Sequence, residues 1–174
     1  MALLPILTAP DPRLKVKAAP VAAVDDKIRR LMDDMLDTMY AAPGIGLAAP
    51  QVGVAKQVIV VDAAREGEPA QALRMANPKV VWQSEETAVY NEGCLSLPEH
   101  YADVERPAEV KVTYLAYDGS EQELHATGLL ATCVQHEIDH LDGTLFVDHI
   151  SQLKRGIILR KLAKAKRSKV AEPA

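Results

Sequence analysis

The sequence predicts a single α+β domain that spans residues 1–174. A length of 174 residues suits one domain with a sizeable core, and 48% hydrophobic with 25% charged residues is usual for a globular protein. Short segments with strand periodicity fill the middle of the chain, while helical periodicity marks one segment near each end and one around residue 135. Internal repeats, low-complexity tracts and interior linkers are absent from the sequence, so one α+β unit accounts for the whole chain.

The N-terminal part combines an extended arm with a strongly amphipathic helix. Residues 1–23 carry four prolines and are expected to run extended over the surface. Asp25 and Asp26 open the helix, and acidic residues occupy its outer face. We expect the inner face to pack into the core, since its methionines adapt well to such packing. That face comprises Ile28, Leu31, Met32, Met35, Leu36, Met39 and Tyr40.

Residues 44–51, GIGLAAPQ, form a run of small side chains that ends in one amide. Such a run lets another backbone approach closely, because nothing bulky stands in the way. It is not a phosphate-binding loop, since it has neither the G-K-[ST] nor the G-x-G-x-x-G pattern. An ordinary helix-to-strand turn remains an alternative interpretation.

The middle of the chain reads as a series of strands. Strands are expected over residues 56–63, 73–82 and 87–91, with a charged loop at 64–70 and a turn or bulge at 92–98. Residues 110–117 and 121–126 predict a hairpin around Asp118 and Gly119. A last amphipathic helix begins near Ser151, and its inward residues are expected to be Leu153, Ile157, Ile158 and Leu162.

Charge is distributed unevenly along the chain. The net charge is −4, but residues 1–153 hold 12 Lys and Arg against 23 Asp and Glu, whereas residues 154–174 hold 8 against 1. An acidic body therefore ends in a basic helix or tail over residues 154–174. Only two cysteines are present, the N-terminus lacks the basic region of a signal peptide, and no apolar run reaches membrane-spanning length. We expect a cytoplasmic protein.

The residues HEIDH at 136–140 form an H-E-x-x-H pattern on a predicted helix. Positions four apart share one face of a helix, so His136 and His140 can bind one metal ion. Glu137 projects beside them, where a general base for a water activated by the ion belongs. Thr127 can cap the start of this helix and Gly143 its end. The alternative is a core helix that happens to carry two histidines.

A catalytic divalent metal usually has three protein ligands, and the residues downstream of the motif offer few third donors. At the position where one protease class places a third histidine, this chain has Phe146, which cannot bind a metal. Another class uses a later glutamate, but the only one here is Glu172, in the terminal tail. Asp148 and His149 stay open as alternatives, although neither matches a known pattern.

Upstream of the motif, Cys94 is the best candidate for the third ligand. It lies in a Gly-Cys turn, where a thiolate can point inward and be stabilised by a cation. The alternative is that Cys94 is a small buried hydrophobic residue. Cys133 lies one turn before His136 and is expected to line the pocket rather than bind the ion.

Three segments together make the sequence resemble the peptide deformylase family. The family motifs stand here as GIGLAAPQ (44–51), EGCLS (92–96) and QHEIDH (135–140), complete and in order, and the similarity covers nearly the whole chain. The resemblance implies antiparallel sheets around a central metal-binding helix, with N-terminal and C-terminal helices. It also implies that the ligands are Cys94, His136 and His140, with Glu137 as acid and base, and Gln51 and the Leu95 amide as donors to the oxyanion.

The resemblance further implies the substrate, which is the N-terminal N-formylmethionine of nascent polypeptides, and formate as a product. By analogy the methionine pocket and the peptide-pairing backbone involve Ile45, Gly46, Tyr90, Gly93, Leu129, Thr132 and Cys133. Many bacterial members carry an arginine seven residues after the ligand cysteine, where this chain has Tyr101, so peptide binding near the pocket mouth could differ. Glu92 and Arg106 are expected to pair and to support the Cys94 turn.

The expected cofactor is one divalent metal ion per chain. A thiolate with two imidazoles suits Zn²⁺, Fe²⁺, Co²⁺ or Ni²⁺, and the resemblance implies Fe²⁺ in cells. It also implies that the basic tail docks to ribosomal RNA, since clustered cations favour phosphate-rich partners. The alternative is that the tail is a solvated face of a helix. We expect a monomer without membrane contact.

Two other functions compete with deformylation. An H-E-x-x-H metallo-endopeptidase is disfavoured by Phe146 and by the intact EGCLS motif. A non-catalytic ribosome-binding module is disfavoured because Glu137 and Gln51, which such a protein could lose, are both present.

Overall fold

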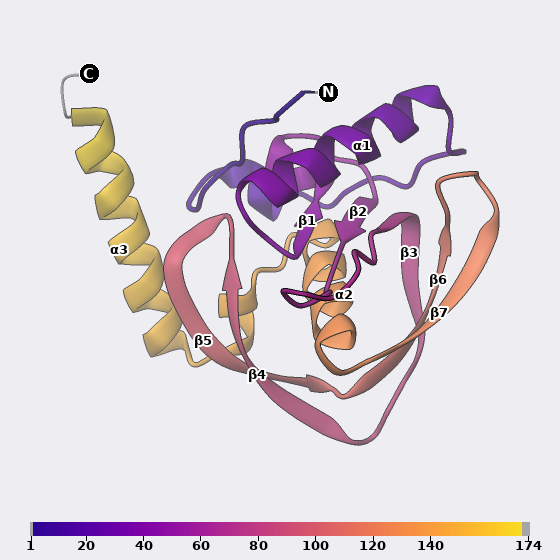
Figure 1. Cartoon of the computed structure of the whole chain (residues 1–174). Helices are drawn as coiled ribbons and strands as arrows, with labels where there is room; N and C mark the ends of the chain where they lie inside the picture. The colour runs from indigo at the N-terminus through magenta and orange to yellow at the C-terminus, as the bar shows by residue number, and fades with distance from the viewer. Residues whose placement is uncertain (1, 172–174) are drawn as a thin grey trace.

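The computed structural model describes residues 2–171, with side chains placed up to residue 168, and confirms the α+β fold. The helices are α1 (Asp26–Ala41), α2 (Gly128–Leu141) and α3 (Gln152–Ala171), with 3₁₀ turns η1 (Pro12–Lys15), η2 (Ala49–Val52) and η3 (Phe146–His149). The strands are β1 (Gly46–Ala48), β2 (Val58–Val61), β3 (Leu73–Gln83), β4 (Thr87–Cys94), β5 (Leu97–Pro107), β6 (Glu109–Leu115) and β7 (Glu121–Thr127). Helix α2 lies near the centre of the molecule and the strands surround it (Figure 1).

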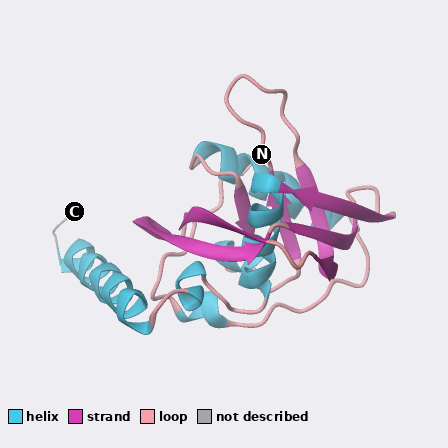
Figure 2. Cartoon of the chain, turned by 90° about the horizontal axis from the view of Figure 1, so that it is seen from below, coloured by secondary structure: helices cyan, strands magenta, loops and turns pink. Residues whose placement is uncertain are grey.

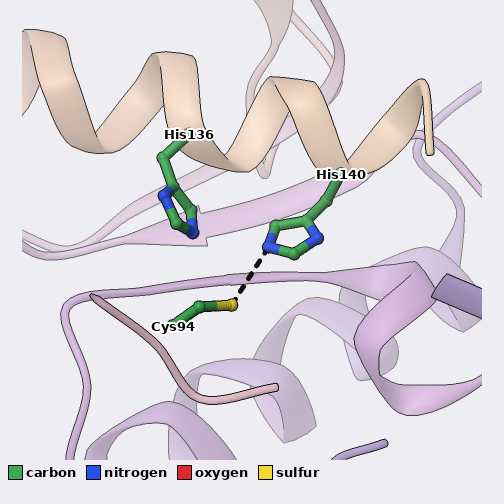
Figure 3. Close-up of side chains that lie close together, drawn as sticks. All are labelled: Cys94, His136 and His140. Carbon is green, nitrogen blue, oxygen red and sulfur yellow. Dashed lines mark hydrogen bonds between the residues drawn. The ribbon is translucent and has the colours of Figure 1, made fainter. Parts of the chain in front are cut away.

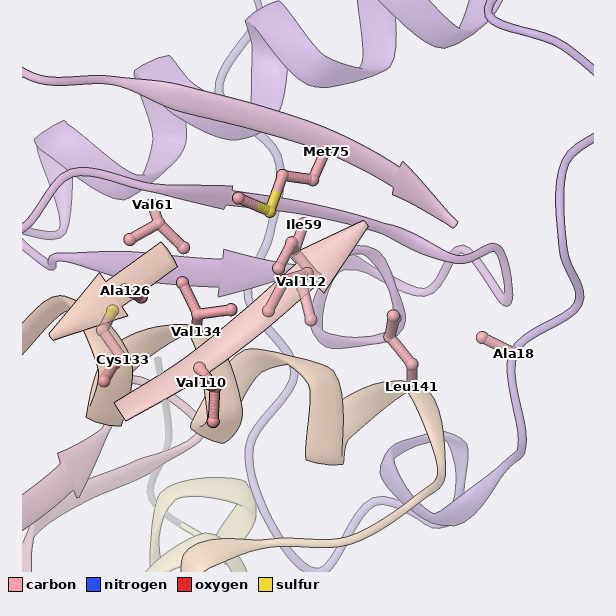
Figure 4. Packing of buried hydrophobic residues seen from close by; sticks show 12 residues of the cluster. Ala18, Ile59, Val61, Met75, Val110, Val112, Ala126, Cys133, Val134 and Leu141 are labelled. Carbon is pink, nitrogen blue, oxygen red and sulfur yellow. The ribbon is translucent and has the colours of Figure 1, made fainter. Parts of the chain in front are cut away.

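Five strands form an antiparallel sheet in the order β1-β2-β3-β6-β7. The four residues of β2 are all fully buried, which explains their unbroken apolar sequence VIVV. The inner face of this sheet packs on α2, where Ile59 and Met75 from the sheet meet Val134 from the helix (Figure 4). The predicted hairpin is present between β6 and β7, with Gly119 at φ +86° in its turn.

Helix α1 covers a second part of the core, above β1 and β2 (Figure 1). The Asp25 carboxylate caps its start by accepting a hydrogen bond from the Ile28 N–H at 3.0 Å. Its methionines Met32, Met35 and Met39 are fully buried, which confirms the predicted inner face. Tyr40 is an exception, because its side chain turns outward and donates a hydrogen bond to Asp62.

Strands β4 and β5 form a separate two-stranded ribbon. The prediction assigned residues 92–98 to a turn and no strand to 97–107. The structure narrows the turn to residues 95–96 and places residues 97–107 in a strand, so the second assignment was wrong. Polar and charged residues cover both faces of β5 and two prolines bound it, so its periodicity is weak. Its pairing with β4 continues to Gly93 opposite Tyr101, and the register then shifts at Cys94.

The C-terminal helix packs on the body through only part of its surface. Ile158 and Leu162 are buried as expected, whereas the side chains of Leu153 and Ile157 are 72% and 38% exposed, which corrects their predicted inward orientation. Figure 2 shows why: α3 projects from the body, so one side of its first turns meets solvent. Within residues 2–171 no helix is long and apolar enough to cross a membrane.

The N-terminal arm contacts the end of α2. It is mostly extended, with the turn η1 started by Asp11, which accepts a hydrogen bond from the Arg13 N–H. Gly143 follows α2 at φ +75°, and a side chain there would collide with the carbonyl oxygen of Lys15. Glycine therefore ends the helix as predicted, and it also allows the arm to pass close by.

Candidate metal centre and catalytic cleft

Cys94, His136 and His140 come together at the boundary between the ribbon and α2. Their donor atoms all lie within 4.8 Å of one another, and Sγ of Cys94 is 3.4 Å from Nε2 of His140. Figure 3 shows the two imidazoles reaching down from the helix while the sulfur approaches from the end of β4. One thiolate and two imidazoles at this spacing suit a tetrahedral divalent ion with one position left for water or substrate.

The imidazoles are held in a dry environment. His136 and His140 are 7% and 1% exposed, and the Phe146 ring stacks on His136 with a centroid distance of 6.1 Å. Phe146, which stands where the protease pattern expects a metal ligand, is thus part of the wall around the candidate ligand His136. Asp148 instead bonds Lys15 and Arg155, and His149 bonds Asp139, so neither joins the three donors. Glu172 lies outside the described residues.

Glu92 and Arg106 pair as predicted, and the pair supports His136 directly. Arg106 donates from Nε and Nη2 to the two carboxylate oxygens of Glu92, at 2.7 and 2.9 Å. Oε1 of Glu92 in turn lies 2.9 Å from Nδ1 of His136. Burial alone would raise the pKa of Glu92, but the hydrogen bonds from His136 and Arg106 outweigh it and hold that pKa below its usual value. Because the ionised Glu92 carboxylate accepts the hydrogen bond from Nδ1 of His136, the Nε2 atom of the same ring is free to bind a metal.

Glu137 is buried beside the metal donors and carries an unsatisfied oxygen. Its side chain is 4% exposed, and no described residue hydrogen-bonds its Oε1. A side chain at Gly46 would collide with Oε2, so glycine is required for β1 to pass this carboxylate. Burial raises the pKa of Glu137 to about 7. A carboxyl group with such a pKa is suited to take up and release a proton near neutral pH.

Hydrogen bonds hold the Gln51 side chain next to Cys94. Its Oε1 accepts the Ala48 N–H at 2.9 Å, which turns the amide nitrogen toward the site. That nitrogen donates to Oγ of Ser96 at 3.0 Å and lies 3.5 Å from Sγ of Cys94. Leu95 lies between Cys94 and Ser96 in the turn that joins β4 to β5. The Gln51 amide N–H is therefore held in a fixed orientation beside the metal donor Cys94.

A cleft of about 730 Å³ opens over the donors. Every residue that the family resemblance implied for the substrate lines this cleft: Ile45, Gly46, Tyr90, Gly93, Leu129, Thr132 and Cys133. The Cys133 thiol is buried, which raises its pKa, and it faces the Ile45 carbonyl at 3.5 Å. A buried thiol with a raised pKa is unreactive. Cys133 is therefore suited to form part of the pocket wall and not to act as a nucleophile.

Tyr101 lies at the mouth of the cleft. Its side chain is 66% exposed, and its ring covers Gly93 so closely that any side chain at Gly93 would collide with it. Glu99 and His100 also line the mouth, and sequence reasoning missed both. They belong to β5, whose pairing brings them to the cleft, and no local pattern marks them.

Two polar partners of the site were also missed. Ser96 holds the Gln51 amide, and Asp139 accepts a hydrogen bond from Nη1 of Arg106 at 2.8 Å. Ser96 lies within the EGCLS motif and Asp139 within QHEIDH, and this membership was the signal that could have identified them.

Comparisons with known proteins agree with this geometry. Residues 3–156 match the family model described as polypeptide deformylase. The peptide deformylase of Phenylobacterium zucineum is 58% identical over 94% of this chain and 97% of its own, and that of Rhizobium meliloti is 55% identical over 99% of each. The crystal structure of peptide deformylase from Ehrlichia chaffeensis superposes with a TM-score of 0.92 at 41% identity, over 97% of this chain and 99% of its own.

The match in sequence and fold extends over 94–99% of this chain. Sequence identities of 41–58% are well above the level at which two proteins share only a fold. The chain therefore belongs to the peptide deformylase family, and it is a metal-dependent hydrolase that removes N-terminal formyl groups from peptides.

Proposed function

We propose that this deformylase acts on the N-formylmethionine of nascent polypeptides through one metal ion held by Cys94, His136 and His140. The observation that carries the proposal is the convergence of these three donors within 4.8 Å beside the buried Glu137. A divalent ion bound there supplies Lewis-acid chemistry, since it lowers the pKa of a water and polarises a carbonyl. The donor set suits several ions, and Fe²⁺ is the ion that we propose for the cell.

We assign proton transfer to Glu137. Its carboxylate accepts the proton of the attacking water and passes it to the departing amine, so that formate and a free N-terminal amine are released. Burial, which raises the pKa of this group to about 7, brings both protonation states within reach during turnover.

We assign oxyanion stabilisation to the Gln51 side-chain amide and the Leu95 backbone N–H. Gln51 is 1% exposed and its orientation is held by Ala48 and Ser96, so little reorganisation is needed when negative charge develops on the formyl oxygen. Each such donor typically lowers the barrier by about 3–4 kcal/mol.

The cleft explains the proposed selectivity. The methionine side chain would occupy the apolar wall formed by Leu129 and Cys133, while the peptide backbone pairs with the strand at Ile45 and Gly46 and with Gly93. A formyl carbon bears hydrogen where an internal peptide carries an α-carbon. Since β1 passes so close to Glu137 that a side chain at Gly46 would collide with it, the space beside the donors is narrow, which disfavours internal peptides.

The C-terminal helix is the proposed ribosome contact. Residues 154–174 hold eight basic residues and one acidic residue, and α3 projects from the body (Figure 2). Such a helix suits salt-dependent binding to ribosomal RNA. We further propose that the enzyme acts in the cytoplasm, where nascent chains emerge, as a monomer whose three metal donors belong to the same chain. Truncation after Leu162, which keeps the buried residues of α3, should weaken ribosome binding at low salt and leave turnover of a short formyl-peptide unchanged.

The decisive experiment is formate release from formyl-Met-Ala-Ser by anaerobically purified protein, with metal analysis of the same sample. We expect formate release, about one metal ion per chain as the three-ligand site requires, and no digestion of casein. Casein digestion without formate release would favour a metallo-endopeptidase, and metal-free protein without either activity would favour a ribosome-binding module.

A further inference from the structure

The two histidines of α2 are supported very differently. Nδ1 of His136 lies 2.9 Å from Oε1 of Glu92, whereas no described residue hydrogen-bonds the buried Nδ1 of His140. Metal-binding histidines normally use their second nitrogen to fix the orientation of the ring. The orientation of the two imidazoles therefore depends on the hydrogen bond between Glu92 and His136.

That support continues to the protein surface. Beyond Glu92, the Arg106 guanidinium donates to Oδ2 of Asp139 at 2.8 Å, and the same oxygen lies 2.8 Å from Nε2 of His149. The side chains become more exposed along the series: Glu92 and Arg106 are 5% exposed, Asp139 is 25% and His149 is 37%. A chain of hydrogen bonds thus joins the surface of η3 to a proposed metal ligand.

We propose that His149 is a positioning residue for the metal centre, and that it acts through Asp139, Arg106 and Glu92 on the His136 imidazole. The inference rests on the proposed role of His136 as a ligand. Asp139 is partly exposed, and the rotation of its carboxylate about χ2 is soft. The hydrogen bond from His149 holds Oδ2 toward Arg106, so that the buried cation keeps both of its carboxylate partners. If Oδ2 turns away, Arg106 is drawn toward Glu92 alone, and the carboxylate on His136 shifts with it.

The structure separates this role from simple anchoring of η3. Asp148 holds that turn independently, through Leu145 N–H at 2.8 Å, Arg155 at 2.7 Å and Lys15 at 3.1 Å. Phe146 and Val147 are also buried beneath it. Loss of the His149 side chain should therefore remove one hydrogen bond and leave the turn in place.

The chain offers a matched control in His125. Nε2 of His125 lies 2.8 Å from Glu109, and the two side chains are 49% and 38% exposed. The contact has the same chemistry as that of His149 with Asp139, but it joins β7 to β6 in the five-stranded sheet. A general effect of deleting a surface histidine should appear equally in both variants.

The test measures loss of Co²⁺ from the loaded holoenzyme to excess chelator, followed by its visible absorption. In His149→Ala we expect release about three- to tenfold faster, below the 10–100-fold typical of a direct partner of a ligand, with a changed Co²⁺ spectrum. His149→Gln, which can still donate to Asp139, should restore the rate to within about twofold. His125→Ala should release Co²⁺ at the parent rate, and KM for formyl-Met-Ala-Ser should stay unchanged in all three.

Parent-like release and spectrum in His149→Ala would overturn the proposal, as would equally fast release in His125→Ala or failure of His149→Gln to restore the rate. Cys94→Ala tests the underlying site separately. Parent-like Co²⁺ binding by that variant would refute the metal ligands themselves, while loss of binding there with no effect at His149 would refute only the positioning role.

Discussion

The metal centre is built from two regions that are organised in opposite ways. Helix α2 contributes His136, Glu137 and His140 from five consecutive residues, so helical geometry alone places the two imidazoles on one face with Glu137 beside them. The ribbon contributes Cys94 at the point where the register between β4 and β5 shifts, and its placement depends on pairing with a strand that local sequence does not mark. The helix supplies a rigid pair of donors, whereas the ribbon supplies one donor through long-range contacts.

One buried side chain connects the two regions. Arg106 on β5 bonds Glu92 on β4 and Asp139 on α2, so one guanidinium ties the ribbon to the helix. Removing one partner from such a buried ion pair leaves an uncompensated charge. Substitutions on the two sides therefore separate the contribution of local helical geometry from that of long-range pairing.

The largest effect is expected from deleting a donor on either side. Cys94→Ala and His140→Ala should each abolish stable metal binding, because two ligands do not hold a catalytic ion well. The value of kcat/KM for formyl-Met-Ala-Ser should fall by about 10³-fold or more. Metal analysis and formate release provide the measurement. If Cys94→Ala retained full metal and activity, the ribbon would have no part in the centre.

Glu137→Gln should separate chemistry from metal binding. The amide keeps the size of the side chain and loses the proton acceptor, so kcat should fall by about 10²–10⁴-fold. The metal content should stay at the parent level, since Glu137 is not among the three donors. Single-turnover formate release by the metal-loaded variant tests this, and a parent-like rate would exclude Glu137 from proton transfer.

Arg106→Ala should weaken the connection between the two regions. Glu92 would remain buried without its cation, which typically costs about 3–5 kcal/mol in the free energy of unfolding. Metal affinity should fall by about 10–100-fold, as is typical when the support of a ligand is lost. Chemical denaturation of the metal-loaded protein and competition with a chelator give the two quantities. Unchanged metal affinity would show that the helix positions His136 without help from the ribbon.

The smallest effect is expected at the start of α2. Thr127 stands at the capping position, but among the described contacts its side chain makes no hydrogen bond to the helix. Thr127→Ala should therefore change the free energy of unfolding by less than about 0.5 kcal/mol, whereas an active cap would cost about 1 kcal/mol. Asp25→Ala, which removes the observed cap of α1, is the matched control and should show the larger loss. Equal losses would mean that Thr127 caps the helix in solution.

Some elements could be predicted because their signals are local. The inner face of α1, the hairpin at Gly119 and the shared face of His136 and His140 follow from periodicity and turn chemistry within a few residues. Strand β5 could not be predicted in this way, because only Leu97, Val104 and Arg106 along it are buried. Its identity as a strand depends on its pairing with β4.

The sequence by itself determined that two imidazoles share one face of a buried helix with a carboxylate beside them, since a fixed helical repeat converts spacing into direction. Its motifs also indicated the family and named Cys94 as the third donor. Only the tertiary structure decided that the sulfur, 46 residues away from His140, arrives within 3.4 Å of that ring. It alone connected Glu92, Arg106, Asp139 and His149, because contacts between distant segments depend on how the ribbon, the helix and η3 pack together.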